Sequence, residues 1–294
     1  MTDTALADAD AALAEREPAR VPGTHRLPTK ALLTAGPFVI VLLLAVVVPL
    51  LAPQSPYKQH LDAISLPPDS GHWLGTDSLG RDVLSRVLYG GRPPALIGIA
   101  AVAVALTVGV LLGLAAGYRG GPVDAVLSRV ADMQLSVPGV VLAIFILTFL
   151  GGGLHNVIVV IALESWPLHY RVVRTLTIAT RNRAYVEAAR TAGLGQLTIL
   201  RRHILPAVLP SLAVTATSNF VTAVLTEASL SFLGLGVQPP TPDWGFMISD
   251  GRTLIVSAWW ISVFPGIGLF LLLLAVQLYG DGLAKSLSLQ SLRR

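Results

Sequence analysis

The sequence predicts an all-α protein in which six helices cross a membrane, and its composition is the first reason. Of the 294 residues, 53% are hydrophobic and only 13% are charged, and the mean hydropathy is +0.68. A soluble domain of this size carries more charge, whereas a membrane helix needs an apolar run of about 20 residues. The chain contains several such runs, separated by polar segments.

Each expected span is placed on one apolar run. The first run follows a polar, Ala-rich start and no cleavage site follows it, so it is predicted to be a retained span rather than a signal peptide. The third and fourth runs are the weakest. The expected spans are 31–52, 93–117, 137–153, 155–170, 207–227 and 256–278.

The polar segments define the expected domain organisation. Residues 1–30 show no apolar period, which predicts a disordered cytoplasmic tail. Residues 53–92 are expected to form an extracytoplasmic loop, and the remaining five helices form a core over 93–280. This core contains a large cytoplasmic loop, 171–206, and a short cytoplasmic tail, 281–294, ends the chain.

Lys and Arg predict the orientation of the spans. Of the 21 basic residues, 16 fall in segments on the same side as the N-terminus, and five fall in loops on the other side. Because cytoplasmic loops carry the excess of Lys and Arg, both termini and the loop 171–206 are expected in the cytoplasm. The protein is therefore expected in the lipid bilayer of the cytoplasmic membrane. Because membrane sidedness already accounts for the basic residues, no nucleic-acid partner is expected.

The most informative segment is Glu187–Pro206, which reads EAARTAGLGQLTILRRHILP. Gly193 follows the glutamate by six residues, and Pro206 follows Gly193 by thirteen. Tyr185 and Ala189 lie four residues apart, which places them on one side of a short helix. Glycine adopts positive φ without steric cost, so Gly193 is expected to end that helix.

The helix pattern alone leaves a second interpretation open. An amphipathic helix could lie on the headgroups with Arg190, Arg201 and Arg202 facing lipid phosphates. The complete spacing through to Pro206 favours a docking loop instead.

Three segments resemble those of a known family. Glu187–Pro206 resembles the EAA loop by which permease subunits of bacterial ABC importers dock onto their ATPase partners. The segments 72–92 and 227–252, with a closing GDGL, are similar to those of the second permease subunit of the peptide and nickel branch. The resemblance covers roughly 72–284. His203 departs from the isoleucine of importers generally, but HILP is typical of this branch.

The resemblance implies a fold, a function and partners. The fold is that of a type I ABC importer permease, and the cargo is a di- or oligopeptide, with nickel or another small solute as the alternative. The partners are a second homologous permease, an extracytoplasmic substrate-binding protein and two ABC ATPase subunits, which use ATP and Mg²⁺. The residues expected to couple to the ATPase are Tyr185, Glu187, Ala188, Ala189, Arg190, Gly193, Leu205 and Pro206.

Other function classes lack their motifs in this chain. The phosphate-binding sequence G-x-x-x-x-G-K followed by Ser or Thr does not occur, so no ATP hydrolysis by this chain is expected. There are no cysteines, and the six histidines lack metal-binding spacing, so neither a metal site nor another cofactor is expected. A self-sufficient secondary transporter is the alternative of another class. It predicts ionisable residues in mid-span and an internal repeat, and neither is found.

Small and acidic residues in the spans supply further candidates. Gly109, Gly113 and Gly117 recur every fourth residue, which predicts a packing seam against another span or a second permease. Gly98 lies outside this register and is expected to tolerate alanine. Glu164 and Glu227 lie near span ends and are candidates for the substrate path, with a hydrated or salt-bridged residue as the alternative.

The extracytoplasmic segments are expected to hold an amphipathic helix over 78–89. Opposite charges stand four residues apart at Asp77 and Arg81, and again at Asp82 and Arg86, which predicts two helical ion pairs. In the second outer loop, Trp244 is expected in the aromatic belt at the membrane interface.

Overall fold

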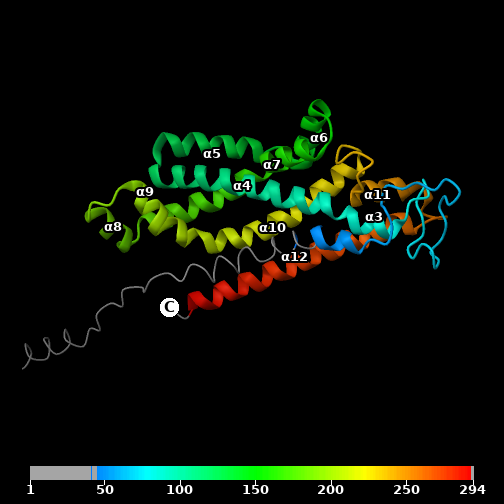
Figure 1. Cartoon of the computed structure of the whole chain (residues 1–294). Coiled ribbons are helices and arrows are strands. Elements are labelled where there is room, and N and C mark those ends of the chain that lie inside the picture. Colours follow the sequence, from blue (N-terminus) through cyan, green and yellow to red (C-terminus); the bar gives the residue numbers. More distant parts are fainter. Residues whose placement is uncertain (1–40, 42–44, 293–294) are drawn as a thin grey trace, which may run out of the picture. The chain divides into compact units, whose positions relative to one another are not determined.

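The structure is a computed structural model, and it describes residue 41 and residues 45–292 (Figure 1). The expected tail 1–30 and most of the expected span 31–52 lie outside the described residues. The described end of that span includes the short 3-10 helix η1 (Val48–Leu51).

Helices make up nearly all of the regular structure, and the described residues contain no strand beyond one isolated bridge, which confirms the all-α fold class. After η1 the order is α3 (Val83–Gly90), α4 (Arg92–Arg119), α5 (Gly121–Leu135), α6 (Gly139–Leu150), α7 (Leu154–Arg181), α8 (Ala184–Thr191), α9 (Gln196–Ile199), the π-helix η2 (Leu200–Ile204), α10 (Leu205–Phe232), α11 (Trp244–Gly251), η3 (Arg252–Leu254) and α12 (Trp260–Leu292).

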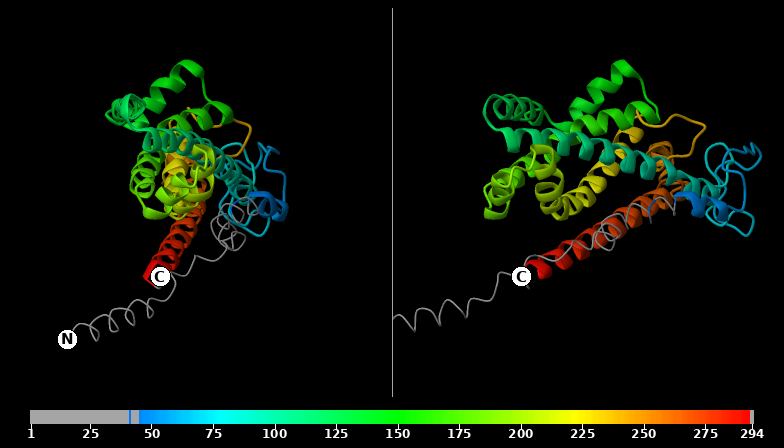
Figure 2. Two further views of the ribbon diagram at one scale, coloured as in Figure 1. Left: turned by 90° about the vertical axis from the view of Figure 1, so that its left-hand side faces the viewer. Right: turned by 60° about the vertical axis from the view of Figure 1, so that its left-hand side comes forward.

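Three long helices, α4, α7 and α10, form the centre of the bundle. α4 lies along α7, and α10 packs against both, while α12 packs against α10 and α11 (Figure 2). The largest apolar core lies where α4, α6, α7 and α10 meet, and it includes the buried side chains of Ile97, Val157 and Phe220.

The bundle carries different elements at its two ends. α8 and α9 lie at one end, where α4 and α7 finish and α10 begins (Figure 1). α3, α11 and residues 53–82 lie at the opposite end (Figure 1). We call these the α8–α9 end and the α3–α11 end.

The expected spans that lie in the described residues are only partly reproduced as single long apolar helices. In the described residues, three helical stretches are long and apolar enough to cross a membrane, and the pair α5 and α6, bent by 86°, could be a fourth. The three stretches contain the second and fifth expected spans and the sixth from residue 260 onwards. They are Val83–Arg119, Gln196–Phe232 and Trp260–Ala284.

The third and fourth expected spans differ most from their predicted ranges. α6 has only 12 residues, because Pro138 precedes it and Gly151, with φ of 79°, ends it. The connection before it is not a loop but the helix α5. α7 continues beyond the expected end at residue 170 as far as Arg181, because Val173 and Thr177 are buried in its packing. Much of the first part of the expected loop 171–206 is therefore helical.

The α3–α11 end folds differently from the helix expected over 78–89. The helix begins only at Val83, because the Asp82 carboxylate caps it by accepting the N–H of Ser85. Asp82 also lies 3.0 Å from Nδ1 of His72 rather than pairing with Arg86. The expected pair of Asp77 with Arg81 forms, at 2.7 Å. Asp77 additionally pairs with Arg86, at 3.2 Å, so one carboxylate serves two guanidinium groups.

Trp244 is a further difference, because it packs against the protein rather than standing in an exposed belt. Its indole Nε1–H donates to the carbonyl of Val87 at 2.8 Å. Its ring lies so close to Gly91 and Gly268 that a Cβ at either position would approach it to 3.0 Å or less.

Candidate functional site

The clearest candidate site is the segment from α8 to the start of α10, and its first feature is the way α8 ends. Gly193 adopts φ of 79°, its N–H donates to the carbonyl of Arg190 at 3.0 Å, and the N–H of Leu194 donates to the carbonyl of Ala189 at 3.2 Å. These two bonds form a Schellman motif, which requires a residue with positive φ at the glycine position. The structure thus confirms Gly193 as the helix stop.

The two faces of α8 have different surroundings. Val186 and Ala189 are buried against the rest of this chain, with exposures of 0% and 7%. Ala189 therefore does not lie on the side that a partner could reach, because its small side chain serves packing within this chain. The predicted coupling residues that remain exposed in α8 and its turn are Tyr185, Glu187, Ala188, Arg190 and Gly193.

An apolar cluster joins α8 to the helices of the bundle. The buried side chains of Val186 and Ala189 pack in one cluster with residues of α7, α9, η2 and α10, and half-buried residues of α4 pack on it. A displacement of α8 would therefore press on the ends of several long helices together. The buried members are Val173, Val186, Ala189, Ile199, Ile204, Val208 and Leu212.

The helical path from this site into α10 is continuous. The stretch Gln196–Phe232 runs through the π-helical turn η2, in which the N–H of Leu205 donates to the carbonyl of Leu200. Leu205 and Pro206 form the first turn of α10, directly after the π-helical turn. These two predicted residues close the loop, and they do so inside a helix rather than at a break.

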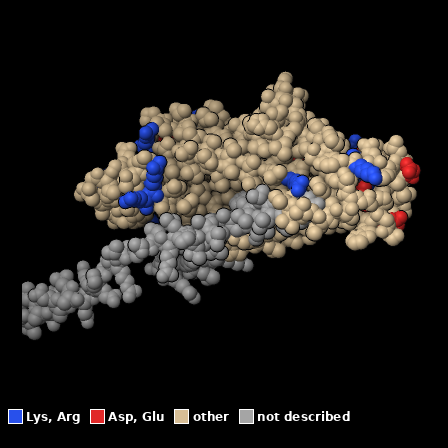
Figure 3. All heavy atoms as spheres, in the orientation of Figure 1, with Lys and Arg blue, Asp and Glu red and all other residues tan. Residues whose placement is uncertain are grey.

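Charged side chains at this site are exposed or hold neighbouring helices together. Arg181 donates to the carbonyls of Gly117 and Tyr118, which joins the end of α7 to the end of α4. The guanidinium of Arg190 lies 6.0 Å from the ring centre of Tyr118. Figure 3 shows basic side chains gathered at the α8–α9 end.

A hollow of about 360 Å³ opens on the outside of this segment. It is lined by Leu197, Thr198, Arg201 and Arg202, and the two arginines are exposed. The site therefore offers a basic hollow on α9 and η2, the elements that follow α8 in the chain.

The glycine seam predicted on α4 is occupied by α7 of the same chain. A Cβ added at Gly109 would lie 2.6 Å from Cβ of His169, and one at Gly113 would lie 2.7 Å from Cβ of Val173. At Gly117 the Cβ of Thr177 would be equally close, at 2.7 Å. The seam thus brings two helices of this chain together rather than facing a second permease.

The two predicted acidic residues do not come together in one site. Glu164 on α7 is half-buried against Gly139 at the start of α6, and one of its carboxyl oxygens has no hydrogen-bond partner. Glu227 is fully buried near the end of α10, where Ser231 donates to it at 2.8 Å. The structure places Asp243 beside Glu227, a neighbour that the sequence spacing does not reveal.

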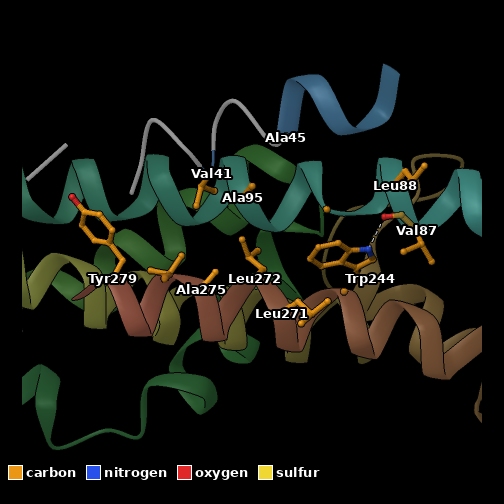
Figure 4. Close-up of a pocket in the computed structure, with 13 residues that line it drawn as sticks. Val41, Ala45, Val87, Leu88, Ala95, Trp244, Leu271, Leu272, Ala275 and Tyr279 are labelled. Atoms are coloured by element: carbon orange, nitrogen blue, oxygen red, sulfur yellow. Dashed lines mark hydrogen bonds between the residues drawn. The ribbon is translucent and has the colours of Figure 1, made fainter. Parts of the chain in front are cut away.

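An apolar pocket of about 490 Å³ lies between α4 and α12, with Val41 on one side (Figure 4). Trp244 stands at one end, and its only polar atom is already bonded to Val87 (Figure 4). The lining contains no charged side chain that could recognise the ends of a peptide. The pocket is therefore a poor candidate for the cargo site.

Sequence reasoning also missed polar residues within the long helices. His169 on α7 is fully buried with neither ring nitrogen bonded, and Asn219 on α10 is 4% exposed with an unbonded side-chain oxygen. Both lie within long helices of the bundle, and only their residue type could have drawn notice. Among the described residues no group of three or more potential metal ligands occurs.

The family comparison matches the part of the chain that contains these features. Residues 109–288 match the model of the family described as "Binding-protein-dependent transport system inner membrane component". The match includes the whole segment from α8 to α10.

Similar proteins of known name extend the match. The chain is 43% identical over 226 residues to the glutathione transport system permease protein GsiD of Pectobacterium atrosepticum, covering 77% of this chain and 75% of that protein. It is 41% identical over 254 residues to the di/tripeptide transport system permease protein DppC of Pseudomonas aeruginosa, covering 84% of each.

A solved structure supports the fold. An inward-facing conformation of the MetNI methionine ABC transporter aligns with a TM-score of 0.53, covering 69% of this chain and 93% of the chain in that structure. The sequences are 21% identical, so this likeness concerns the fold alone.

Proposed function

This chain belongs to the family of binding-protein-dependent transport system inner membrane components, and we propose that it is the permease subunit of an ABC importer that carries di- or oligopeptides. The observation that carries the proposal is the segment from α8 to α10, in which an apolar cluster joins a partly exposed helix to the bundle. The names of the similar proteins refer to glutathione and di/tripeptides, which favours a peptide over nickel.

The proposed assembly contains several subunits. The chain pairs with a second homologous permease, and two ABC ATPase subunits contact the exposed face of α8 and the neighbouring basic hollow. ATP and Mg²⁺ are bound by those ATPase subunits and not by this chain. A substrate-binding protein delivers the peptide at the α3–α11 end.

The proposed orientation places the α8–α9 end in the cytoplasm. Seven of the 21 basic residues of the chain lie between positions 171 and 206, and an excess of Lys and Arg is typical of cytoplasmic loops. Both termini lie on the same side in this arrangement.

The coupling mechanism follows from the way α8 is attached. An ATPase that changes conformation displaces α8, and the apolar cluster around Val186 transmits the movement because close-packed side chains resist compression. The continuous helix Gln196–Phe232 carries the displacement along α10. A change of access between the two membrane faces then follows from movement of α10 against α4 and α7.

The experiment that tests the coupling role replaces Gly193 by aspartate. This change requires a side chain at φ of 79° and places an unpaired charge at the proposed ATPase contact, where a buried unpaired charge costs several kcal/mol. We expect loss of most ATPase co-purification and peptide uptake, with normal membrane insertion.

The matched control is Gly195→Asp, in the same loop. Gly195 precedes α9 with φ of −65° and has open space around its Cβ position, and aspartate is favoured at such an N-cap. We expect this variant to keep its partner subunits. Full uptake and normal ATPase recovery with Gly193→Asp would show that this segment is not the coupling element.

A further inference from the structure

Two buried carboxyl groups lie side by side where the end of α10 packs against the start of α11. Glu227 on α10 and Asp243, the N-cap residue of α11, are both 0% exposed. Ser231 donates to Oε1 of Glu227 at 2.8 Å, and Oδ1 of Asp243 accepts the N–H of Phe246 at 3.0 Å. This leaves Oε2 of Glu227 and Oδ2 of Asp243 buried without a hydrogen-bond partner.

No positive charge compensates this pair among the described residues. The groups that act on the two carboxyls are each other, Ser231 and backbone N–H groups at the start of α11. Charged side chains on neighbouring elements make other contacts. Arg252 lies over the ring of Phe232, Arg92 donates to the carbonyl of Ala45, and Asp250 accepts from Ser78.

Two ionised carboxylates in this position would be strongly unfavourable. Burying a charge without a partner is strongly unfavourable, and two like charges side by side repel each other. Burial raises the pKa of Asp243, which acts against a fully ionised pair. The chain is closely packed around Ser231, since a Cβ at Gly236 would overlap its Oγ.

We propose that Glu227 and Asp243 bind one shared proton. Glu227 is the neutral acid, and its Oε2–H donates to Oδ2 of the Asp243 carboxylate, so a single proton satisfies both unpartnered oxygens. The negative charge lies on Asp243, because it accepts a backbone N–H at the N-terminus of α11 and Glu227 has no such donor. The resulting hydrogen bond links the end of α10 to the start of α11.

The proton site makes the stability of the α3–α11 end depend on pH. The folded chain keeps a proton that the unfolded glutamate, with an ordinary pKa of about 4.3, releases at neutral pH. Because the folded state then binds more protons than the unfolded state, stability falls as pH rises. One proton corresponds to a roughly tenfold loss in the folding equilibrium constant for each pH unit.

Infrared spectroscopy of the purified full-length chain tests the proposal directly. Glutamate labelled with ¹³C in its side-chain carboxyl should shift a protonated-acid C=O band at neutral pH in the unsubstituted protein. The band should disappear in Glu227→Gln and persist in Glu164→Gln, a control that removes the half-buried glutamate of α7 instead. Absence of a labelled acid band, or its loss only with Glu164→Gln, overturns the proposal.

Thermal unfolding provides a second measurement. The unfolding temperature of the unsubstituted chain should fall between neutral and alkaline pH, and Glu227→Gln should flatten that dependence while Glu164→Gln keeps it. A rise in unfolding temperature with Na⁺, Mg²⁺ or Ca²⁺ at constant ionic strength, lost in Glu227→Gln, would assign the pair to a cation instead. These measurements require neither transport nor partner subunits, so they are independent of the proposed function.

Discussion

The two ends of the bundle are held together by different forces. At the α8–α9 end the contacts between elements are mostly apolar, and most charged side chains are exposed. At the α3–α11 end the contacts include buried charges, with Asp77, Arg81 and Arg86 all less than 7% exposed. A close-packed apolar contact passes a displacement on to its neighbours, whereas a buried ion pair is costly to separate. The difference suits a movable end that transmits motion and a firm end that keeps its geometry.

The first prediction tests whether the two ends lie on opposite sides of the membrane. The chain contains no cysteine, so single cysteines can be introduced at exposed positions without competing thiols. Ser70→Cys and Thr241→Cys at the α3–α11 end should react fully with an impermeant thiol reagent added to intact cells, and Arg183→Cys should not react. Labelling only at Arg183 would place the α8–α9 end outside the cell, and this segment could then not contact a cytoplasmic ATPase.

Local sequence signals predicted the α8–α9 end well. Gly193 ends α8 because glycine adopts positive φ, and the glutamate in the first turn and the closing proline are equally local signals. The same reasoning placed Ala189 on one side of the helix with Tyr185, but Ala189 is buried and Tyr185 is exposed. A short helix with small residues on several sides does not indicate which side is buried.

The α3–α11 end could not be predicted because its contacts join distant residues. The indole N–H of Trp260 donates to the carbonyl of Thr76, 184 positions away in the sequence, and Trp244 reaches Val87. Helical spacing predicted the pair of Asp77 with Arg81 but not the second pair with Arg86, which depends on a turn before α3. Periodicity carries no information about such contacts.

The second prediction weakens the firm end. Asp77→Asn removes the one carboxylate that pairs with two buried guanidinium groups, and losing one partner of a buried pair costs roughly 3–5 kcal/mol. We expect a large fall in the unfolding temperature of the purified chain. The control Asp62→Asn changes an exposed carboxylate and should leave the unfolding temperature unchanged. Equal behaviour of the two variants would show that buried charge does not hold this end.

The third prediction concerns the seam between α4 and α7, which connects the two ends. Gly113→Ala places a Cβ 2.7 Å from Val173 and 2.9 Å from the backbone oxygen of Tyr170, and overpacking of this kind typically costs about 1–3 kcal/mol. Gly266→Ala on α12 meets nothing within 4 Å and serves as the control. Thermal unfolding of both variants measures the difference, and equal stability would mean that the helices can separate freely.

Gly98 sharpens this third comparison, because the expectation that it tolerates alanine conflicts with the structure. It lies eleven residues before Gly109, close to three helical turns, so it returns to nearly the same side of α4 despite the different register. A Cβ there would lie 2.7 Å from the ring of Phe220 on α10. A side chain can move more easily than the backbone, so Gly98→Ala should lower stability less than Gly113→Ala.

The last prediction has the smallest expected effect and isolates one hydrogen bond at the α3–α11 end. Trp244→Phe keeps an aromatic ring against Gly91 and Gly268 but removes the N–H that donates to Val87. A buried carbonyl without its donor costs about 1–3 kcal/mol, and the lower part of this range applies because the ring is only partly buried. The control Trp73→Phe alters an indole that is 72% exposed. If both variants unfold at the temperature of the unsubstituted chain, the hydrogen bond between α11 and α3 adds no stability beyond packing. The stability of the α3–α11 end then depends on its buried charged groups.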